Sequence, residues 1–267
     1  MLTADEIQSA ATRLFTAEQT RVQTGLLSIL HPDMTMDDAY AVQAAYIALR
    51  HARGCKTIGW KIGLTSKAMR SALNITTPDS GVLMDDMAFD DGAVIQADRF
   101  IQPRIEAELA FILKSRLQGP GITVTDVLAA TDSIMPALEI LDTRILRVDP
   151  ASGKTRTIVD TISDNAANAG IVTGGRAMRP DAFDPRWAGA IVMRNGEVEE
   201  TGLGAGVLNE PALAVAWLAN RLGLYGQHIA PGQIVLSGSF IRPIEARPGD
   251  TILADFGPMG TVSCHFA

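Results

Sequence analysis

The sequence has little cysteine and little histidine. Only two cysteines, Cys55 and Cys264, occur in 267 residues, which is too few for a disulfide framework and fits the reducing cytoplasm, where we expect the protein. His51 and Cys55 lie four residues apart without a second pair at zinc spacing, so we interpret them as ordinary residues near a helix end. With four histidines in all, a histidine-based metal site is not expected, whereas an ion bound by oxygen ligands remains open.

Long apolar runs and basic clusters are also lacking. No run is long enough to span a bilayer, and the N-terminal stretch MLTADEIQSAATRL carries acids early, so we expect neither a secretory signal nor a membrane anchor. The formal net charge of -7 argues against a nucleic-acid partner, since phosphate binding depends on clustered lysine and arginine. We therefore expect no nucleic acid and no membrane among the partners.

Two motifs of common enzyme classes are missing. The glycines of GLGAG at 202–206 follow a predicted hairpin rather than a parallel strand, and their spacing is wrong for a dinucleotide-binding loop. There is no Gly-x-Ser-x-Gly elbow and no cysteine–histidine pair in a nucleophile context, so acyl-enzyme chemistry has no candidate.

What is present divides the chain at about residue 55. Residues 3–20 have helical composition, and a helix over 35–54 is signalled by Thr35 as N-cap, by Asp38 three residues later and by Gly54 at its end. Short strands broken by glycine and proline dominate afterwards, and strand–helix alternation does not repeat. The pattern predicts an α+β fold with a mostly non-parallel sheet or roll behind an N-terminal helical region at 1–55.

The later elements are predicted from local patterns. Asn195-Gly196 is typical of a hairpin turn. A helix is expected over 209–223, with Asn209 as its cap, Pro211 in its first turn and Gly223 at its end. Further expectations are a short helix at 66–73, a turn at 76–81, solvated turns at 83–92, and strands at 56–64, 104–113, 133–142, 232–240, 250–257 and 261–267.

The segment RIEAELAFIL at 104–113 places two carboxylates in an apolar strand. Successive side chains of a strand point to opposite faces, so Glu106 and Glu108 project together. Burying both requires a cation between them, for which a divalent metal ion is suitable. The alternative is an edge strand whose outer face is wet, and this segment alone favours that alternative.

The strand KTIGWKIGL at 56–64 sets Lys61 between Gly59 and Gly63 on one face. Glycine in a strand often marks the close approach of a ligand or another backbone, which invites a functional role for the lysine. The alternative is a solvent-facing edge lysine.

A third carboxylate, Glu139, lies in the apolar run SIMPALEILD. The three glutamates, Lys61, Asp79 and the polar segment DTISDNAANAG would together make an oxygen-rich site suited to Mg²⁺.

Several segments resemble a known family in order and spacing. GWKIGLTSKAM, TPDSGVLMDDM, RIEAELAF, PALEILDTR, DTISDNAANAG and GVLNEPALAVAWLANRL are similar to the 2-hydroxypentadienoate hydratase family of the fumarylacetoacetase-like superfamily, from about residue 25 to the C-terminus. The likeness is greatest to the branch that hydrates 2-oxohept-4-ene-1,7-dioate in homoprotocatechuate breakdown. It implies a mixed β-roll catalytic domain over 56–267, and assembly into pentamers or decamers.

The resemblance also implies roles for individual residues. Glu106, Glu108 and Glu139 would ligate Mg²⁺ or Mn²⁺, and Lys61 and Asp79 would transfer protons. The substrate would be a 2-hydroxy-2,4-diene diacid in equilibrium with its 2-oxo tautomer, hydrated to a 4-hydroxy-2-oxo acid.

The substrate contacts are less constrained by sequence. The distal carboxylate of the substrate needs a cation, and Arg242 in the segment GSFIRP is our candidate, with Arg104 and Arg70 as alternatives. Either the side chains in DTISDNAANAG, namely Ser163, Asn165 and Asn168, line the substrate pocket, or they tie down a turn.

Three alternative functions remain at this point. One is decarboxylation of a vinylogous 2-oxo acid, as in 4-oxalocrotonate decarboxylase, which shares the Glu-x-Glu motif. Another is carbon–carbon hydrolysis of the fumarylacetoacetate type. Hydrolysis normally needs a basic residue to activate water, and the strand and lysine segments that match the family contain no histidine, which argues against this alternative. The third is a catalytically inert partner of a hydratase–decarboxylase complex, against which the intact set of five site residues speaks.

Overall fold

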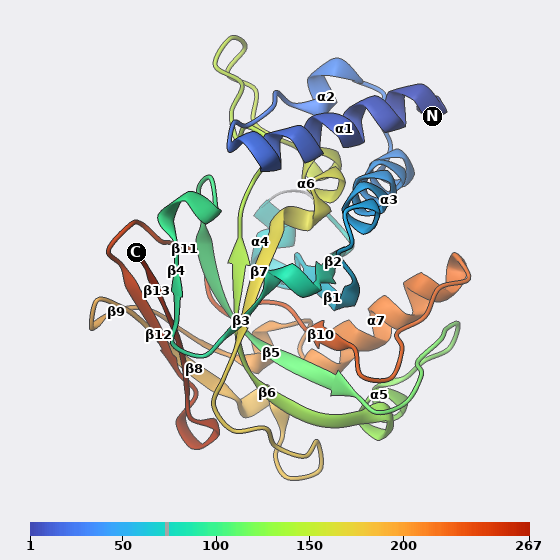
Figure 1. Cartoon of the computed structure of the whole chain (residues 1–267). Coiled ribbons are helices and arrows are strands. Elements are labelled where there is room, and N and C mark those ends of the chain that lie inside the picture. Colours follow the sequence, from blue (N-terminus) through green and yellow to red (C-terminus); the bar gives the residue numbers. More distant parts are fainter. Residues whose placement is uncertain (73–74) are drawn as a thin grey trace.

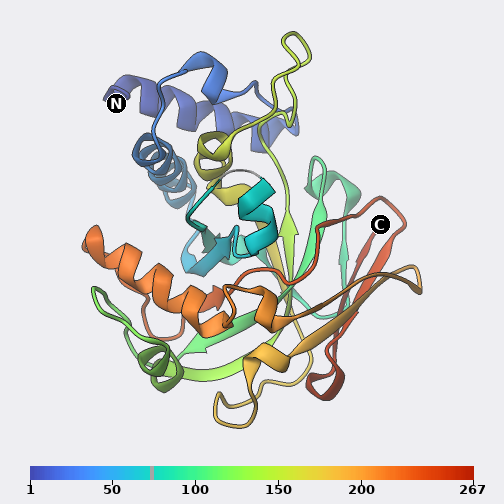
Figure 2. The same cartoon turned by 180° about the vertical axis from the view of Figure 1, so that it is seen from behind.

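The computed structural model describes residues 1–72 and 75–267. Figures 1 and 2 show a helical layer on top of a strongly curved β-structure, with the C-terminal strands at one side. The helices are α1 Ala4–Thr20, α2 Leu27–Leu30, α3 Met36–Ala52, α4 Lys67–Ala72, α5 Val124–Ala130, α6 Ile158–Ser163 and α7 Pro211–Leu224. The strands are β1 Thr57–Gly63, β2 Asp79–Met84, β3 Ala88–Asp90, β4 Ala93–Ile95, β5 Arg104–Leu113, β6 Thr131–Leu141, β7 Asn168–Thr173, β8 Gly189–Arg194, β9 Glu197–Leu203, β10 Ile234–Leu236, β11 Ile244–Glu245, β12 Thr251–Asp255 and β13 Thr261–Phe266.

The two expected N-terminal helices are confirmed, and both begin with a capping box. Thr3 and Glu6 cap α1, and Thr35 and Asp38 cap α3. Hydrogen bonds from the side chain and backbone of Thr35 lower the pKa of Asp38 to about 2. Each helix therefore satisfies its first backbone N–H groups locally, before it packs on anything else.

The strands form two sheets of mixed direction. The larger sheet has the order β2-β1-β10-β5-β6-β7-β3, with β11 paired to β5, and the smaller has the order β4-β13-β12-β8-β9. The β1–β10, β3–β7 and β4–β13 pairs are parallel, while the other strand pairs in these sheets are antiparallel. The predicted α+β roll with a mostly non-parallel sheet is confirmed, including the β8–β9 hairpin that turns on Asn195-Gly196.

The strand β5 has two apolar faces that serve different parts of the core. Ile105, Leu109 and Phe111 belong to the large cluster between the sheets and helices α5 and α7. On the opposite face Ala110 joins a small cluster with Ala137 of β6 and other inner-face residues. The predicted alternation along β5 is therefore correct, and Glu106 and Glu108 share the face of the small cluster.

The N-terminal helices form a second core with later parts of the chain. Leu14 of α1 and Tyr46 of α3 are fully buried, and their cluster includes Met84, Ile145 and Ile162. The segment that follows β6 and carries α6 thus packs under the helical layer, as Figure 1 shows. In the part of the chain that the structure describes, no helix is both long and apolar enough to cross a membrane.

Two boundary predictions are wrong near the site. Asp79 does not lie in a turn but begins β2, where it is the register partner of Gly63. The expected strand 232–240 contains only the three residues of β10. The segment after β10 still donates backbone hydrogen bonds to β5 from Ser237 and Phe240, but the N–H of Gly238 between them bonds the Glu108 side chain and interrupts the ladder.

The expected boundaries of helix 209–223 also need correction. Asn209 has a positive φ of 69°, which an N-cap does not adopt, and Glu210 caps α7 instead. Gly223 does not end the helix, which continues to Leu224. Its lack of a side chain has another cause, because a Cβ there would lie 2.5 Å from the carbonyl oxygen of Gly119.

Two other expected segments are partly correct. The expected helix at 66–73 is present as α4, and Leu73 lies outside the described residues. In the expected solvated turns at 83–92, most side chains are exposed, but Leu83, Met84 and Met87 are buried and Ala88–Asp90 forms β3.

Candidate active site

The three glutamates come together on two adjacent central strands. Glu106 and Glu139 are register partners in the antiparallel β5–β6 pair, and Glu108 lies two residues further along β5. Glu108 and Glu139 are fully buried, and Glu106 is partly buried. Since β5 lies between β10 and β6, the edge-strand alternative is wrong.

The carboxylates have the geometry of a metal site. Glu106, Glu108 and Glu139 each offer one oxygen, and these three atoms lie within 4.8 Å of one another. Glu108 Oε2 accepts a hydrogen bond of 2.7 Å from the backbone N–H of Gly238. Within the described ranges, Glu108 Oε1 and Glu139 Oε2 are buried without a hydrogen-bond partner. Buried oxygens without partners are costly, so this cluster is suited to a bound cation.

The electrostatics of the metal-free cluster are unfavourable for full ionisation. Burial, followed by the charge of Glu139, raises the pKa of Glu106 to about 8 and that of Glu108 well above its usual value. Burial also raises the pKa of Glu139, although Lys61 opposes this. A divalent ion would remove the repulsion and the desolvation cost together.

Lys61 projects from β1 into this cluster and is only 3% exposed. Its Nζ lies 3.3 Å from Glu139 Oε1. Burial acts to lower the pKa of Lys61, but the charges of Glu139 and Asp79 outweigh burial and raise it. Because β1 lies between β2 and β10, Lys61 is not a solvent-facing edge lysine.

Asp79 and Lys61 flank one small space that Gly63 leaves open. A Cβ on Gly63 would lie 2.2 Å from Asp79 Oδ1 and 3.1 Å from Lys61 Nζ. Asp79 is buried, and burial raises its pKa against the opposing charge of Lys61. The glycine at this position therefore lets an acid and an amine lie beside the same small space. Gly59 has a different role, because a Cβ there would clash with the backbone of Ile234.

The polar segment after α6 supports the site through backbone contacts. Asn165 exchanges two hydrogen bonds with Val82, and Asn168 Nδ2 also donates to the carbonyl of Val82. The Ser163 hydroxyl donates to Val159 within its own helix. These contacts hold β2 in place, while among the described atoms Asn168 Oδ1 stays buried without a hydrogen-bond partner.

This segment is strained. Asn165, Ala166 and Ala167 all have φ between 52° and 58°, a region that costs non-glycine residues about 1 kcal/mol or more each. Arg144 holds the segment, because its guanidinium donates to the Asp164 carboxylate and to the carbonyls of Asp164 and Asn168. Arg144 was not among the residues predicted from the sequence, although it stands in the segment PALEILDTR.

The three arginines considered for the substrate's distal carboxylate lie in different places. Arg242 is 81% exposed and pairs with Glu200 at 2.6 Å. Arg70 donates to the carbonyls of Leu64 and Thr65 and so braces the loop after β1. Arg104 lies on β5, on the same face as Glu106 and two residues from it, so it is the arginine that the strand carries toward the carboxylates.

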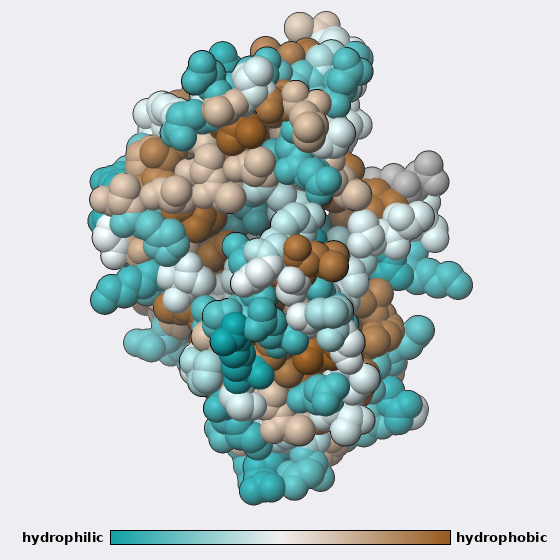
Figure 3. Space-filling view, turned by 90° about the vertical axis from the view of Figure 1, so that its right-hand side faces the viewer, coloured by the Kyte–Doolittle hydropathy of each residue, from teal (hydrophilic) through white to brown (hydrophobic). Residues whose placement is uncertain are grey.

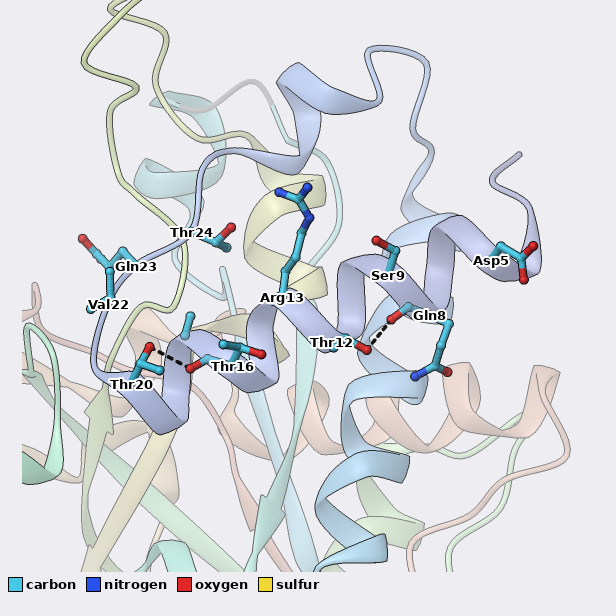
Figure 4. A pocket seen from close by; sticks show the side chains of 11 residues that line it. Asp5, Gln8, Ser9, Thr12, Arg13, Thr16, Thr20, Val22, Gln23 and Thr24 are labelled. Carbon is cyan, nitrogen blue, oxygen red and sulfur yellow. Dashed lines mark hydrogen bonds between the residues drawn. The ribbon is translucent and has the colours of Figure 1, made fainter.

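Two surface cavities, one along α1 and one between α3 and α7, do not contain the carboxylate cluster. Figure 4 shows a polar groove along α1, where the hydroxyls of Thr12 and Thr20 already donate to helix carbonyls. A second cavity lies between α3 and α7, on the side seen in Figure 3, where hydrophobic and hydrophilic surface are interspersed. This cavity reaches Trp60 and Ser80, which are the neighbours of Lys61 on β1 and of Asp79 on β2. The side chains of Lys61 and Asp79 point to the other face of the sheet, away from this cavity.

Comparison with known proteins gives full-length matches. The chain is 53% identical over 256 residues to 2-oxo-hept-4-ene-1,7-dioate hydratase of Escherichia coli, covering 96% of each protein. It is 40% identical over 262 residues to 2-hydroxyhexa-2,4-dienoate hydratase of Comamonas testosteroni, covering 97% of each. The solved structure of 4-oxalocrotonate decarboxylase from Pseudomonas putida G7, complexed with magnesium and adipate, matches with a TM-score of 0.94 at 35% identity, covering 100% of this chain and 99% of that one. No family model matches the chain.

Proposed function

Since the chain belongs to the family of 2-hydroxydienoate hydratases and 4-oxalocrotonate decarboxylases with the fumarylacetoacetase-like fold, we propose that it is a divalent-metal-dependent hydratase of 2-oxohept-4-ene-1,7-dioate. The product would be 4-hydroxy-2-oxoheptanedioate, formed in the breakdown of aromatic compounds. The observation that carries this proposal is the buried triad Glu106, Glu108 and Glu139 beside Lys61 and Asp79, in a chain whose 53% identical relative is a hydratase of this diacid.

The triad suits Mg²⁺ by its donor type. It supplies only carboxylate oxygens, two of them buried and without hydrogen-bond partners in the described part of the chain. When bound there, Mg²⁺ or Mn²⁺ would act as a Lewis acid that polarises the 2-oxo acid end of the substrate. The related decarboxylase was solved with magnesium, which supports the same choice here.

Lys61 and Asp79 would move the protons. In the first step the dienol loses its 2-hydroxyl proton to Asp79 Oδ1, while Lys61 Nζ donates a proton to C5, which gives the conjugated 2-oxo-3-ene. In the second step the oxygen of water would add to C4 while the neutral Lys61 Nζ takes the proton that water loses. The protonated Asp79 would donate its proton to C3, so both side chains regain their starting protonation states. Lys61 and Asp79 flank the space above Gly63, so both would reach the same face of the substrate's carbon chain.

The test is the loss of dienol ultraviolet absorbance with the purified protein. We expect Mg²⁺-dependent decay with the seven-carbon diacid, loss of activity with a chelator, and neither Mg²⁺ binding nor turnover in Glu106→Gln. A Glu106→Gln protein that binds Mg²⁺ and turns over like the parent would show that the metal site is elsewhere. Equal activity on the monoacid 2-hydroxypenta-2,4-dienoate would contradict the diacid specificity.

The second candidate is decarboxylation at the same site, favoured by the TM-score of 0.94 to a 4-oxalocrotonate decarboxylase. Carbon dioxide release from the vinylogous 2-oxo acid separates the two reactions. We expect none from the seven-carbon diacid, because hydration keeps all seven carbons in the product.

The cellular setting forms part of the proposal. A cytoplasmic, ring-shaped homo-oligomer, pentameric or decameric, is what the family resemblance implies, with a decarboxylase as a further partner. Light scattering of the purified protein measures its mass directly and tests the ring.

A further inference from the structure

Three arginines from separate segments converge at the end of the β5–β6 pair nearest to Glu106. Arg104 begins β5 and is the register partner of Leu141, where β6 ends. Arg147 and Arg156 face each other at the base of the hairpin that follows β6, because the backbone N–H of Arg156 donates to the carbonyl of Arg147. Arg147 and Arg104 also line one cavity of about 410 Å³.

Each of these guanidinium groups has an unused donor inside the protein. Among the residues that the structure describes, Arg104 Nε, Arg147 Nε and Arg156 Nη1 are all buried without a hydrogen-bond acceptor. Arginine has no acceptor of its own, so such N–H groups require an anion or water. Unused donors on three neighbouring guanidinium groups are what a carboxylate ligand would satisfy.

Among the described residues, the surrounding acids neutralise the group only in part, because Glu245 pairs with Arg104 while the nearby aspartates bind other groups. Both oxygens of Asp142 accept backbone N–H bonds from Ile101 and Gln102. The Asp164 carboxylate is bound by Arg144, and the Asp160 carboxylate by Ser28 and Thr157. Glu245 is half exposed and lies 3.3 Å from Arg104. Burial, followed by the charges of Arg104 and Arg156, lowers the pKa of Arg147 to about 10, although the charges of Glu245 and Asp142 oppose this.

The cluster lies near the proposed active site along β5. Arg104 and Glu106 are two residues apart on one face of β5, which corresponds to about 7 Å along a strand. The charge of Arg156 reaches Asp79 and acts to lower its pKa. A seven-carbon chain with bonds of about 1.5 Å spans about 7.5 Å between its terminal carbons when extended. Its far end would therefore reach the arginines when its near end lies at the glutamates.

We propose that Arg104, Arg147 and Arg156 form the subsite for the distal carboxylate and thereby select linear dicarboxylic 2-oxo acids over monocarboxylic ones. This inference rests on the proposed function and assigns to these three arginines the specificity that the sequence alone placed on Arg242. Arg242 is bound to Glu200 at the surface, whereas the cluster has buried donors to offer.

The experiment compares Arg147→Met and Arg156→Met with the parent on 2-oxohept-4-ene-1,7-dioate and on the monoacid 2-hydroxyhexa-2,4-dienoate. Losing a charge-assisted hydrogen bond should lower kcat/KM for the diacid by about 10- to 100-fold, while kcat/KM for the monoacid stays within about twofold. The retained monoacid activity shows that the variant is folded. Arg156→Lys keeps the charge and should recover part of the loss.

Arg179→Met is the matched control, since Arg179 is 79% exposed and pairs with Asp181. It removes the same charge from the surface, and both substrates should react as with the parent. Equal loss on the diacid and the monoacid in the Arg147 and Arg156 variants would overturn the subsite, as would a diacid-selective loss in Arg242→Met alone.

Calorimetry keeps the subsite testable independently of turnover. The Mg²⁺-loaded parent should bind 2-oxoheptanedioate at least about tenfold more tightly than 2-oxoheptanoate, and Arg156→Met should abolish the difference. A parent that turns over neither dienoate but shows this difference would contradict the proposed hydratase reaction and leave the subsite supported. A parent that turns over the diacid without any difference in binding would contradict the subsite alone.

Discussion

Without its metal ion, the protein should lose stability as the pH rises from about 4.5 to 8. The cause is Glu106, whose pKa is raised from 4.5 to about 8 by burial and by the charge of Glu139. Between these values the folded protein keeps a proton that the unfolded chain has released, so deprotonation favours unfolding. The raised pKa of Lys61 does not offset this, because the amine is charged in both states below about pH 10.

The size of the effect follows from the shift. One pKa unit corresponds to about 1.4 kcal/mol, so Glu106 alone could cost about 5 kcal/mol at pH 8. Because Glu106 keeps some contact with solvent, we expect about 2 to 3 kcal/mol. This is a large part of the free energy of unfolding of an ordinary domain.

The assay is urea unfolding at pH 5, 6, 7 and 8, at one protein concentration, in EDTA and in excess Mg²⁺. In EDTA the midpoint should fall with pH. In Mg²⁺ it should not, because the ion binds the ionised carboxylates of the folded state only. Glu106→Gln should be more stable than the parent in EDTA at pH 8 and should gain little from Mg²⁺. Glu197→Gln, at the exposed β8–β9 turn, is the matched control and should behave like the parent.

A flat stability profile in EDTA between pH 5 and 8 would refute the reasoning. So would a Glu106→Gln protein that is no more stable than the parent without metal. Either result would mean that the three carboxylates are compensated without a divalent ion.

Three further predictions concern single residues. Lys61→Met should lower kcat by about 10²- to 10⁴-fold, leaving slow metal-dependent turnover with Mg²⁺ affinity retained in calorimetry. Gly63→Ala should lower kcat strongly, because its Cβ would lie 2.2 Å from Asp79 Oδ1. The control Gly25→Ala, with no atom within 4 Å of the new Cβ, should be as active as the parent. Equal kcat values for the two variants would contradict the proposed crowding at Gly63. Arg144→Met should destabilise the protein by about 3 to 5 kcal/mol in urea unfolding, because it strands the buried carboxylate of Asp164, and a change below about 1 kcal/mol would contradict that role.

Much of the local structure could be predicted from the sequence. The Thr35–Asp38 cap, the alternation along β5 and the Asn195-Gly196 hairpin depend on residues a few positions apart, and the structure confirms them. The shared face of Glu106 and Glu108 is also a consequence of strand geometry alone.

The boundary errors have tertiary causes. Asp79 looked like a turn residue beside Pro78, but pairing with Gly63 on β1 makes it the first residue of β2. Gly223 looked like a helix end, but the close backbone of Gly119 requires it. In both cases a residue distant in sequence determined where the element begins or ends or why a glycine is needed, and no local sequence pattern indicates such a contact.

The same division applies to the site. The sequence by itself determined which chemical groups are available to the proposed site, because a carboxylate, an amine or a guanidinium keeps its donor and acceptor character in any fold. The tertiary structure decided what those groups can do. It placed β5 inside the sheet, set Glu139 opposite Glu106, and brought Arg147 and Arg156 beside Arg104, because sheet order and long-range packing alone determine which side chains lose water and share one space.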